Sequence, residues 1–125
     1  MQNTGTSSST NYIETTITGS SNSTTINQKS TGGSSVLLNV SNNNNIVSVV
    51  QENTGQHYAE ITLSGSDKTV NVSQSGSAGH MARIELHGGA TSLTATQSGS
   101  TQQSYSITHT CATASCAAIT VTQGQ

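Results

Sequence analysis

The chain has 125 residues, of which 30% are hydrophobic, 2% aromatic and 6% charged, and its formal net charge is −2. This length allows one domain, and without any run of like charges there is no electrostatic surface for nucleic acid or for an anionic membrane. A low hydrophobic content indicates disorder only together with a high net charge, so we look to the spacing of residues for an ordered structure.

A glutamine recurs at a nearly constant interval. The first three intervals are 23 residues and the last is 26, and a fixed period of this size is the signature of a repeat architecture. We therefore expect a flexible or subunit-bridging segment, 1–11, before five repeats at 12–33, 34–55, 56–79, 80–102 and 103–125. The recurring residues are Gln28, Gln51, Gln74, Gln97 and Gln123.

Apolar residues occupy five positions in each repeat: 15, 13, 11, 4 and 2 residues before the glutamine, with three extra residues allowed in the last repeat. Alternation at every second residue is the period of a β-strand, so each repeat predicts strand, tight arc, strand and connecting turn. Twenty-two of the 25 positions are apolar, and the exceptions are Thr15, Thr24 and His109. The predicted inward core includes Ile17, Ile26, Val40, Val49, Ile61, Leu63, Val70, Val72, Ile84, Leu86, Leu93, Ile107, Ile119 and Val121.

The arcs are predicted to start at residue types that tolerate the positive φ of a sharp turn, namely Gly19, Asn42, Gly65 and Gly88. One repeat cannot bury its own apolar face, but stacked repeats can, with strands paired in parallel. Proline does not occur, so nothing removes a backbone donor from such a ladder. The predicted fold class is an all-β parallel β-solenoid, a stack of five β-arches and a candidate subunit of a cross-β filament.

The glutamines share the inward parity of the aliphatic residues before them. A buried amide is costly unless it is hydrogen-bonded. In a stack, each amide can donate to the carbonyl of the next one, as in cross-β cores. We therefore predict a ladder of five glutamines. A second inward column, six residues before the glutamine, starts with Asn22 and Asn45 and continues with Lys68 and Thr91.

The last repeat contains both cysteines of the chain. Cys111 takes the position of the arc glycines, and Cys116 falls opposite Ala90 with the three-residue insertion between the cysteines. A disulfide that closes the enlarged arc is the simpler interpretation and implies an oxidising, extracytoplasmic setting. Two buried free thiols are the alternative.

A repeat with inward aliphatics, an arc glycine, an asparagine three residues later and a closing glutamine resembles the curlin repeat. The resemblance covers residues 12–125, and the usual second glutamine is replaced by an aliphatic residue, which indicates a divergent member. It is clearest in Ile17-x-Gly19-x-x-Asn22-x-x-x-Ile26-x-Gln28 and in Leu63-x-Gly65 with Val70-x-Val72-x-Gln74.

Curlin repeats build curli, the extracellular functional amyloid of bacterial biofilms. The resemblance implies a secreted structural subunit of an adhesive fibre, or pilus, on the bacterial cell surface. It further implies a homopolymer that grows head to tail, a nucleator subunit and an outer-membrane export pore. The pattern itself favours polymerisation, because both terminal repeats are strand-like and open solenoid ends present unpaired strand edges.

We expect no catalytic, cofactor or metal site, because no Ser-His-acid set and no paired carboxylates can be placed. His57 and His80, each seventeen residues before its glutamine, should stack at the start of a strand. A metal-binding or pH-sensing pair is conceivable, but an exposed polar edge is favoured without a third ligand. Glu60 and Arg83 share an outward column and can pair across the ladder.

Non-polymerising β-solenoids remain an alternative. Ice-binding proteins carry outward Thr-x-Thr rows, and only the last two repeats have one, Thr94 with Thr96 and Thr120 with Thr122. A surface-binding adhesin needs an exposed apolar or aromatic patch. The nearest candidates are Tyr12, Tyr58 and Met81 at one strand start. No stretch approaches the roughly 18 apolar residues of a membrane span.

Overall fold

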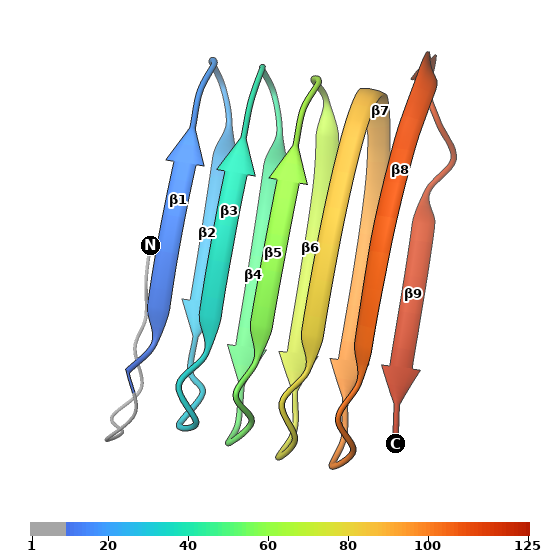
Figure 1. The fold of residues 1–125 in the computed structure, drawn as a ribbon. Coiled ribbons are helices and arrows are strands. Elements are labelled where there is room, and N and C mark those ends of the chain that lie inside the picture. The colour runs from blue at the N-terminus through green and yellow to red at the C-terminus, as the bar shows by residue number, and fades with distance from the viewer. Residues whose placement is uncertain (1–9) are drawn as a thin grey trace.

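The computed structural model describes residues 10–125, which form nine β-strands (Figure 1). Residues 1–9, most of the segment expected to be flexible or subunit-bridging, lie outside the described residues. Each of the first three repeats supplies two separate strands, joined by an arc at one end and a connecting turn at the other. The strands are β1 Tyr12–Ile17, β2 Ser23–Gln28, β3 Ser35–Val40, β4 Ile46–Glu52, β5 Tyr58–Leu63, β6 Lys68–Ser75, β7 Met81–Ser98, β8 Ser104–Ser115 and β9 Ile119–Gly124.

Two parallel ladders face each other across the core. One contains β1, β3, β5, the first part of β7 and β8, and the other contains β2, β4, β6, the second part of β7 and β9. In Figure 1 the arches stand side by side from the blue N-terminal arch to the red C-terminal one. The predicted parallel β-solenoid with a period of about 23 residues is confirmed.

The inward columns form one continuous core. In the three middle repeats the inward aliphatic side chains are between 0% and 2% exposed, as at Val49, Leu63 and Leu86. Among the described residues, the first and last repeats each have a neighbouring repeat on one side only. Ile17 is therefore 44% exposed, and Ile107, Ile119 and Val121 are partly buried. The prediction that Ile17 is a core residue is wrong, because no preceding repeat among the described residues covers it. The other predicted inward residues share one interior, which the last repeat leaves partly uncovered.

The arc positions have the backbone that their residue types suggest. Positive φ occurs at Gly19 (106°), Asn42 (73°), Gly65 (103°) and Gly88 (80°). A Cβ built on Gly65 would lie 2.0 Å from the carbonyl oxygen of Gly88 in the next repeat. At Gly65, glycine is therefore required by the turn and by the close approach of the neighbouring arc.

The fourth and fifth repeats differ from the prediction at their arcs. β7 runs through its arc as one strand, because its ladder to β8 continues from Gly88 opposite Cys111 to Ala90 opposite Ser115. The prediction that Cys116 lies opposite Ala90 is wrong. Gly88 and Ala90 have one residue between them, whereas their partners Cys111 and Ser115 have three. Two of the three inserted residues therefore form a bulge between the cysteines, and the third inserted residue follows Ser115.

Replacement of Gly65 tests the packing of one arc on the next. Gly65→Ala should lower the free energy of unfolding by about 2 kcal/mol or more, because a side chain at positive φ is strained and its Cβ meets backbone. Asn71→Thr, at an exposed outward position of β6, is the matched control and should leave it nearly unchanged. Urea unfolding followed by circular dichroism measures both, and equal stability of the two variants would contradict this account of the arcs.

Candidate functional site

A line of side-chain amides runs through the whole solenoid. The Nε2 of Gln28 donates to the Oε1 of Gln51, and three further links of the same kind continue to Gln74, Gln97 and Gln123, each 2.9 Å long. The first four glutamines are fully buried. This is the arrangement expected from the 23-residue spacing, and its donors all point toward the C-terminal end.

The same amides also join the two sheets. Gln74 Nε2 donates to the carbonyl oxygens of Tyr58 (3.0 Å) and His80 (3.1 Å), where strands of the facing sheet start. Gln51 and Gln97 make the corresponding bond to Ser35 and Met81, at 3.1 Å each. Each of the first four glutamines therefore connects the end of its own strand to the start of the facing strand and to the next repeat.

The column six residues before the glutamine lies inside the arcs. Asn45 Nδ2 donates to the carbonyl oxygens of Ser41 (3.2 Å) and Gly65 (3.1 Å). Its Oδ1 accepts from the backbone N–H of Lys68 (3.1 Å). Asn22 makes equivalent bonds one repeat earlier. The arcs are thus stacked through side chains as well as backbone.

Lys68 replaces asparagine in this column and is fully buried. Its Nζ donates to the carbonyl oxygens of Gly88 (2.6 Å) and Gly89 (2.7 Å) in the next arc. Burial lowers the pKa of the Lys68 ammonium, and the carboxylate of Asp67 offsets part of this effect. Sequence reasoning placed Lys68 in an inward column but did not identify the arc carbonyls as its partners.

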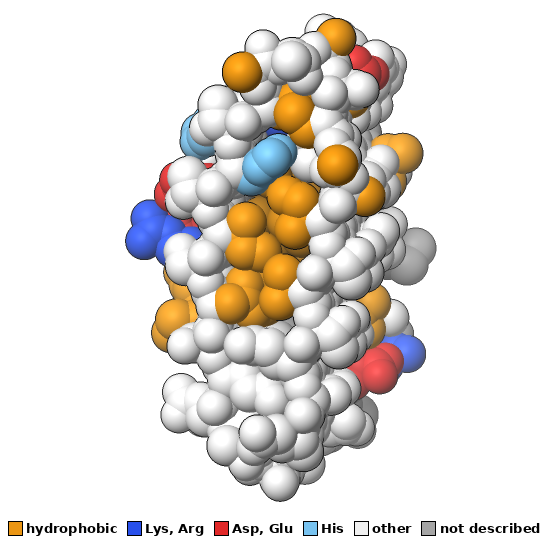
Figure 2. Space-filling view, turned by 90° about the vertical axis from the view of Figure 1, so that its right-hand side faces the viewer, with side chains coloured by type: hydrophobic (Ala, Val, Ile, Leu, Met, Phe, Trp, Pro, Cys, Tyr) orange, Lys and Arg blue, Asp and Glu red, His pale blue; other side chains and the backbone are white. Residues whose placement is uncertain are grey.

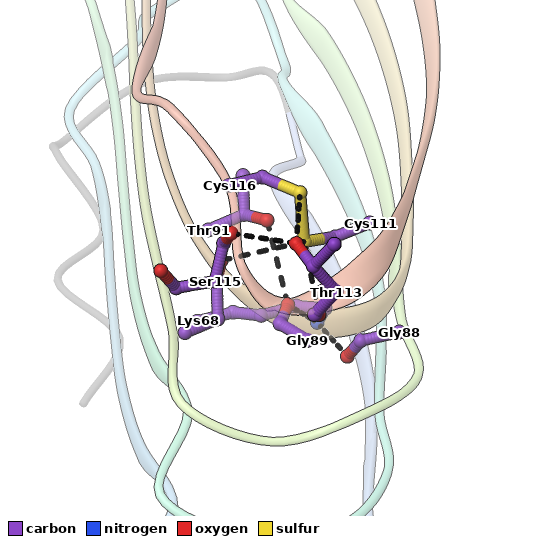
Figure 3. The surroundings of a disulfide bond; sticks show 9 residues. Lys68, Gly88, Gly89, Thr91, Cys111, Thr113, Ser115 and Cys116 are labelled. Carbon is purple, nitrogen blue, oxygen red and sulfur yellow. Dashed lines mark hydrogen bonds between the residues drawn. A yellow bond between two sulfur atoms is a disulfide. The ribbon is translucent and has the colours of Figure 1, made fainter.

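A disulfide joins Cys111 and Cys116 in the last arc (Figure 3). Thr113 lies between them and donates its hydroxyl to the carbonyl oxygen of Ser115 (2.8 Å). Figure 3 shows this bond close to Gly88 and Gly89, whose carbonyl groups bind Lys68. The disulfide thus closes the bulge, which is the simpler of the two interpretations drawn from the sequence.

His57 and His80 stack as expected, with ring centroids 5.2 Å apart and ring planes at 14°. The prediction that they form an exposed edge is wrong, because each is only 1% exposed. The arches close around them at the connecting turns, where Nε2 of His57 lies 2.8 Å from the Glu52 carbonyl oxygen and that of His80 lies 3.0 Å from that of Ser75.

The histidines belong to a column of side-chain acceptors. Ser34 N–H donates to Asn11 Oδ1 (2.8 Å), and His57 N–H donates to Ser34 Oγ (3.2 Å). His80 N–H donates to Nδ1 of His57 (3.3 Å), so this ring is neutral with its hydrogen on Nε2. Burial lowers the pKa of His57, while its hydrogen bond to Glu52 opposes that effect and the neighbouring His80 adds to it. The sequence signal for this column was the 23-residue spacing of its members, such as Ser34, His57 and His80.

The outer faces carry isolated polar contacts. Arg83 lies 4.0 Å from the Glu60 carboxylate, in the pair predicted from the sequence, and closer to Glu85 at 3.2 Å. Exposed pairs of this kind contribute about 0–1 kcal/mol. Tyr12 and Met81 are 54% and 46% exposed, whereas Tyr58 between them is partly buried. These residues do not merge into one apolar patch, because Ser35 separates Tyr12 from Tyr58 in the ladder.

Unpaired buried polar atoms gather at the two ends of the stack. Within residues 10–125, three of the seven lie in the first repeat and three in the last, and the seventh belongs to His80, whose next neighbour is the last repeat. The second and third repeats, 34–79, contain none. The seven atoms are Thr24 Oγ1, Asn27 Oδ1, Gln28 Oε1, His80 Nδ1, Gln103 Oε1, Tyr105 Oη and His109 Nε2.

The C-terminal end exposes the interior of the solenoid. Figure 2 looks onto this end and shows a strip of hydrophobic side chains between two polar walls, with a histidine beside it. The partly buried apolar residues of the last repeat are Tyr105, Ile107, Ile119 and Val121. A polar hollow of about 360 Å³ opens at the same end between residues 101–103 and 122–125. Among the described residues, β8 and β9 each have a neighbouring strand on one side only.

Residues 10–125 contain no group of three or more His, Cys, Asp or Glu side chains that could hold a metal ion. The same residues include no helix that is long and apolar enough to cross a membrane. Comparison with protein-family models, curated proteins and solved structures gives no match for this chain. The candidate functional site is therefore the pair of open ends and the amide ladder that connects them.

The ladder should stabilise the interior much more than the last repeat. Gln74→Ala should cost about 2–4 kcal/mol, because it removes a buried amide that binds two carbonyl groups, leaves Gln97 Oε1 without its donor and takes one of two acceptors from Gln51. Gln123→Ala, at the partly buried end of the same ladder, should cost less than about 1 kcal/mol. Urea unfolding of both variants measures the difference, and similar costs at the two positions would contradict a cooperative buried ladder.

Stability should fall in mild acid because His57 is buried as a neutral ring. Its pKa in the folded protein lies below the ordinary value of about 6.5, so the unfolded chain takes up the proton first. The stabilisation is therefore fully present above about pH 6.5 and decreases as the pH falls below that value. Unfolding in urea between pH 8 and pH 5 measures this slope.

Two variants identify the residue responsible. His57→Asn, which introduces the residue found at this position in the first repeat, should flatten the slope. His87→Asn, at a partly exposed histidine on the outer face, should retain it. An unchanged slope in His57→Asn would assign the acid sensitivity to another group.

Proposed function

We propose that this chain is the structural subunit of an extracellular, curli-like fibre that grows by stacking copies head to tail. The observation that carries the proposal is the placement of the unpaired buried atoms in the terminal repeats. Buried polar groups in native structures are almost always hydrogen-bonded. A second copy, added in the 23-residue register, would bring hydrogen-bond donors to the two glutamine acceptors among these atoms, Gln28 Oε1 and Gln103 Oε1.

The glutamine ladder illustrates the match. Gln28 Oε1 is a buried acceptor without a donor, and Gln123 Nε2 is the donor at the other end of the same ladder. Because all amide donors point toward the C-terminal end, Gln123 of one copy meets Gln28 of the next with the polarity of every internal link. Gln103 Oε1 likewise meets the first repeat of the next copy. In the column of Gln103, the side-chain acceptor of one repeat binds the backbone N–H of the following repeat, as Asn11 does with Ser34.

The apolar strip and the charge distribution favour the same contact. Stacking would cover Ile107, Ile119 and Val121 on one copy and Ile17 and Ile26 on the next, which converts two partly covered layers into interior. The last repeat contains no Asp, Glu, Lys or Arg. Natural proteins commonly protect strand edges with charges, so the C-terminal end has no such protection.

The extracellular setting rests on two observations. The disulfide between Cys111 and Cys116 fits an oxidising compartment. The curlin-like repeat pattern of residues 12–125 points to a secreted fibre subunit with roles in biofilm and adhesion. The nucleator subunit and the outer-membrane export pore belong to the proposal through this resemblance alone.

The direct test is incubation of the purified chain followed by electron microscopy and fibre diffraction. We expect unbranched filaments with a reflection near 4.8 Å along the fibre axis, the spacing of neighbouring strands, and one near 10 Å across it. A chain that stays monomeric after long incubation with added fibre seeds would contradict the proposal and favour a non-polymerising surface-binding module.

A charge on the end face should stop growth. Val121→Lys places an ammonium in the apolar strip of the last repeat, where a solitary chain can still hydrate it but a stacked copy cannot. We expect this variant to fold as a monomer and to form no fibres. Its first repeat is intact, so it should still add to a wild-type fibre end and block the next addition at substoichiometric amounts.

Thr120→Lys is the matched control. Thr120 is the neighbouring residue on the exposed outer face of β9, so this charge stays in water after stacking. The control should form fibres at the wild-type rate and should not inhibit wild-type growth. Sedimentation and thioflavin fluorescence measure both effects, and equal inhibition by the two variants would exclude the end face as the growth surface.

A further inference from the structure

His109 interrupts an aliphatic column at the open end of the solenoid. It lies on β8 opposite Leu86, at the position that Val40 and Leu63 occupy in the second and third repeats. Its imidazole is partly buried, and Nε2 is enclosed without a hydrogen-bond partner among residues 10–125. Figure 2 shows a histidine ring on this end beside the apolar strip. It is the single residue of the last repeat whose ordinary pKa lies between pH 5 and pH 8.

The surroundings of His109 offer no acid to a protonated ring. On β7, Arg83, Glu85 and His87 alternate with the inward residues and lie on the outer face. On β6 the titratable side chain is Lys68, a cation bound to the Gly88 and Gly89 carbonyls.

The remaining neighbours add no negative charge near neutral pH. Tyr105 shares the inward face of β8, and burial raises the pKa of its hydroxyl. Cys111 is held in the disulfide, and β9 contains no titratable side chain. Among the described residues, no carboxylate therefore lies close enough to balance the charge of an imidazolium in this position.

Stacking would cover the ring with an apolar side chain. When Gln123 meets Gln28 of the next copy, the same register places Ile17 of that copy over His109, because Ile17, Val40, Leu63, Leu86 and His109 form one column. Ile17 is 44% exposed in the single chain and so is available for this contact. A neutral imidazole can be covered by an aliphatic side chain at modest cost, whereas an unpaired buried charge is strongly unfavourable.

We infer that His109 makes the addition of a second copy of this chain depend on pH, with the neutral ring permitting stacking and the protonated ring opposing it. The inference rests on the head-to-tail function proposed above. Because a protonated ring must lose its proton for each junction formed, the association constant should fall as the pH is lowered, by up to tenfold per pH unit. Growth is then favoured in neutral surroundings and suppressed in mildly acidic ones.

The test measures the monomer concentration that remains in equilibrium with sonicated fibre seeds at pH 8, 6.5, 5.5 and 5. For the wild-type chain we expect this concentration to rise as the pH is lowered from 8 to 5, by up to about tenfold per pH unit. His109→Leu, which gives the last repeat the leucine found at the equivalent position 86, should show a nearly constant monomer concentration at all four pH values. Circular dichroism of the soluble fraction restricts the comparison to pH values at which the monomer is folded.

Two histidine variants serve as controls. His87→Asn removes a ring on the outer face, and His57→Asn removes the buried ring that affects folding; both should retain the wild-type dependence of fibre growth on pH. A pH dependence in His109→Leu equal to that of the wild type would overturn the inference, as would a wild-type value that does not change with pH. The failure of every variant to extend seeds at any pH would instead overturn the proposed fibre function.

Discussion

The structure depends on hydrogen bonds between the same positions of successive repeats. Each inward glutamine finds its partner in the glutamine one repeat later, and the backbone of each strand does the same. These bonds exist only while the register is kept, because a shift by one residue would turn every inward side chain outward. A chain with few hydrophobic residues can therefore fold: most of its buried polar groups are satisfied by repetition, and a thin row of Ile, Val and Leu fills the remaining space.

Repetition of this kind contains no internal stopping point. The second and third repeats leave no buried side-chain polar atom unpaired within the described chain, whereas the first and last repeats leave six. Gln28 lacks a donor for the same reason that Gln51 has one, since only the neighbouring repeat can supply it. The unpaired acceptors of Gln28 and Gln103 are thus a consequence of ending the stack, and a further copy in the same register is the partner whose geometry the internal repeats already define.

The inward columns, the glutamine ladder and the arc positions were predictable, because parity and spacing are properties of the chain itself. The burial of His57 and His80 was not, because it arises where the arch closes and the rings reach the carbonyls of the connecting turns. Lys68 interrupts a column of amides in the sequence, and only the folded arc shows two carbonyl groups in reach of its Nζ. Counting residues could not locate the bulge near Cys116, since the position of inserted residues is set by the path of the backbone.

The residues that break the inward pattern should make the junction between chains weaker than the folded interior of one chain. Thr15, Thr24 and His109 are the three non-apolar members of the columns, and all lie in terminal repeats. Contacts among the second, third and fourth repeats therefore join fully aliphatic layers, whereas a junction between chains joins two layers that mix apolar and polar groups. Since stabilisation follows the apolar area removed from water, a junction should be weaker than an internal layer. A chain built in this way folds before it stacks, and its exposed last layer presents a finished template to the first layer of the next chain.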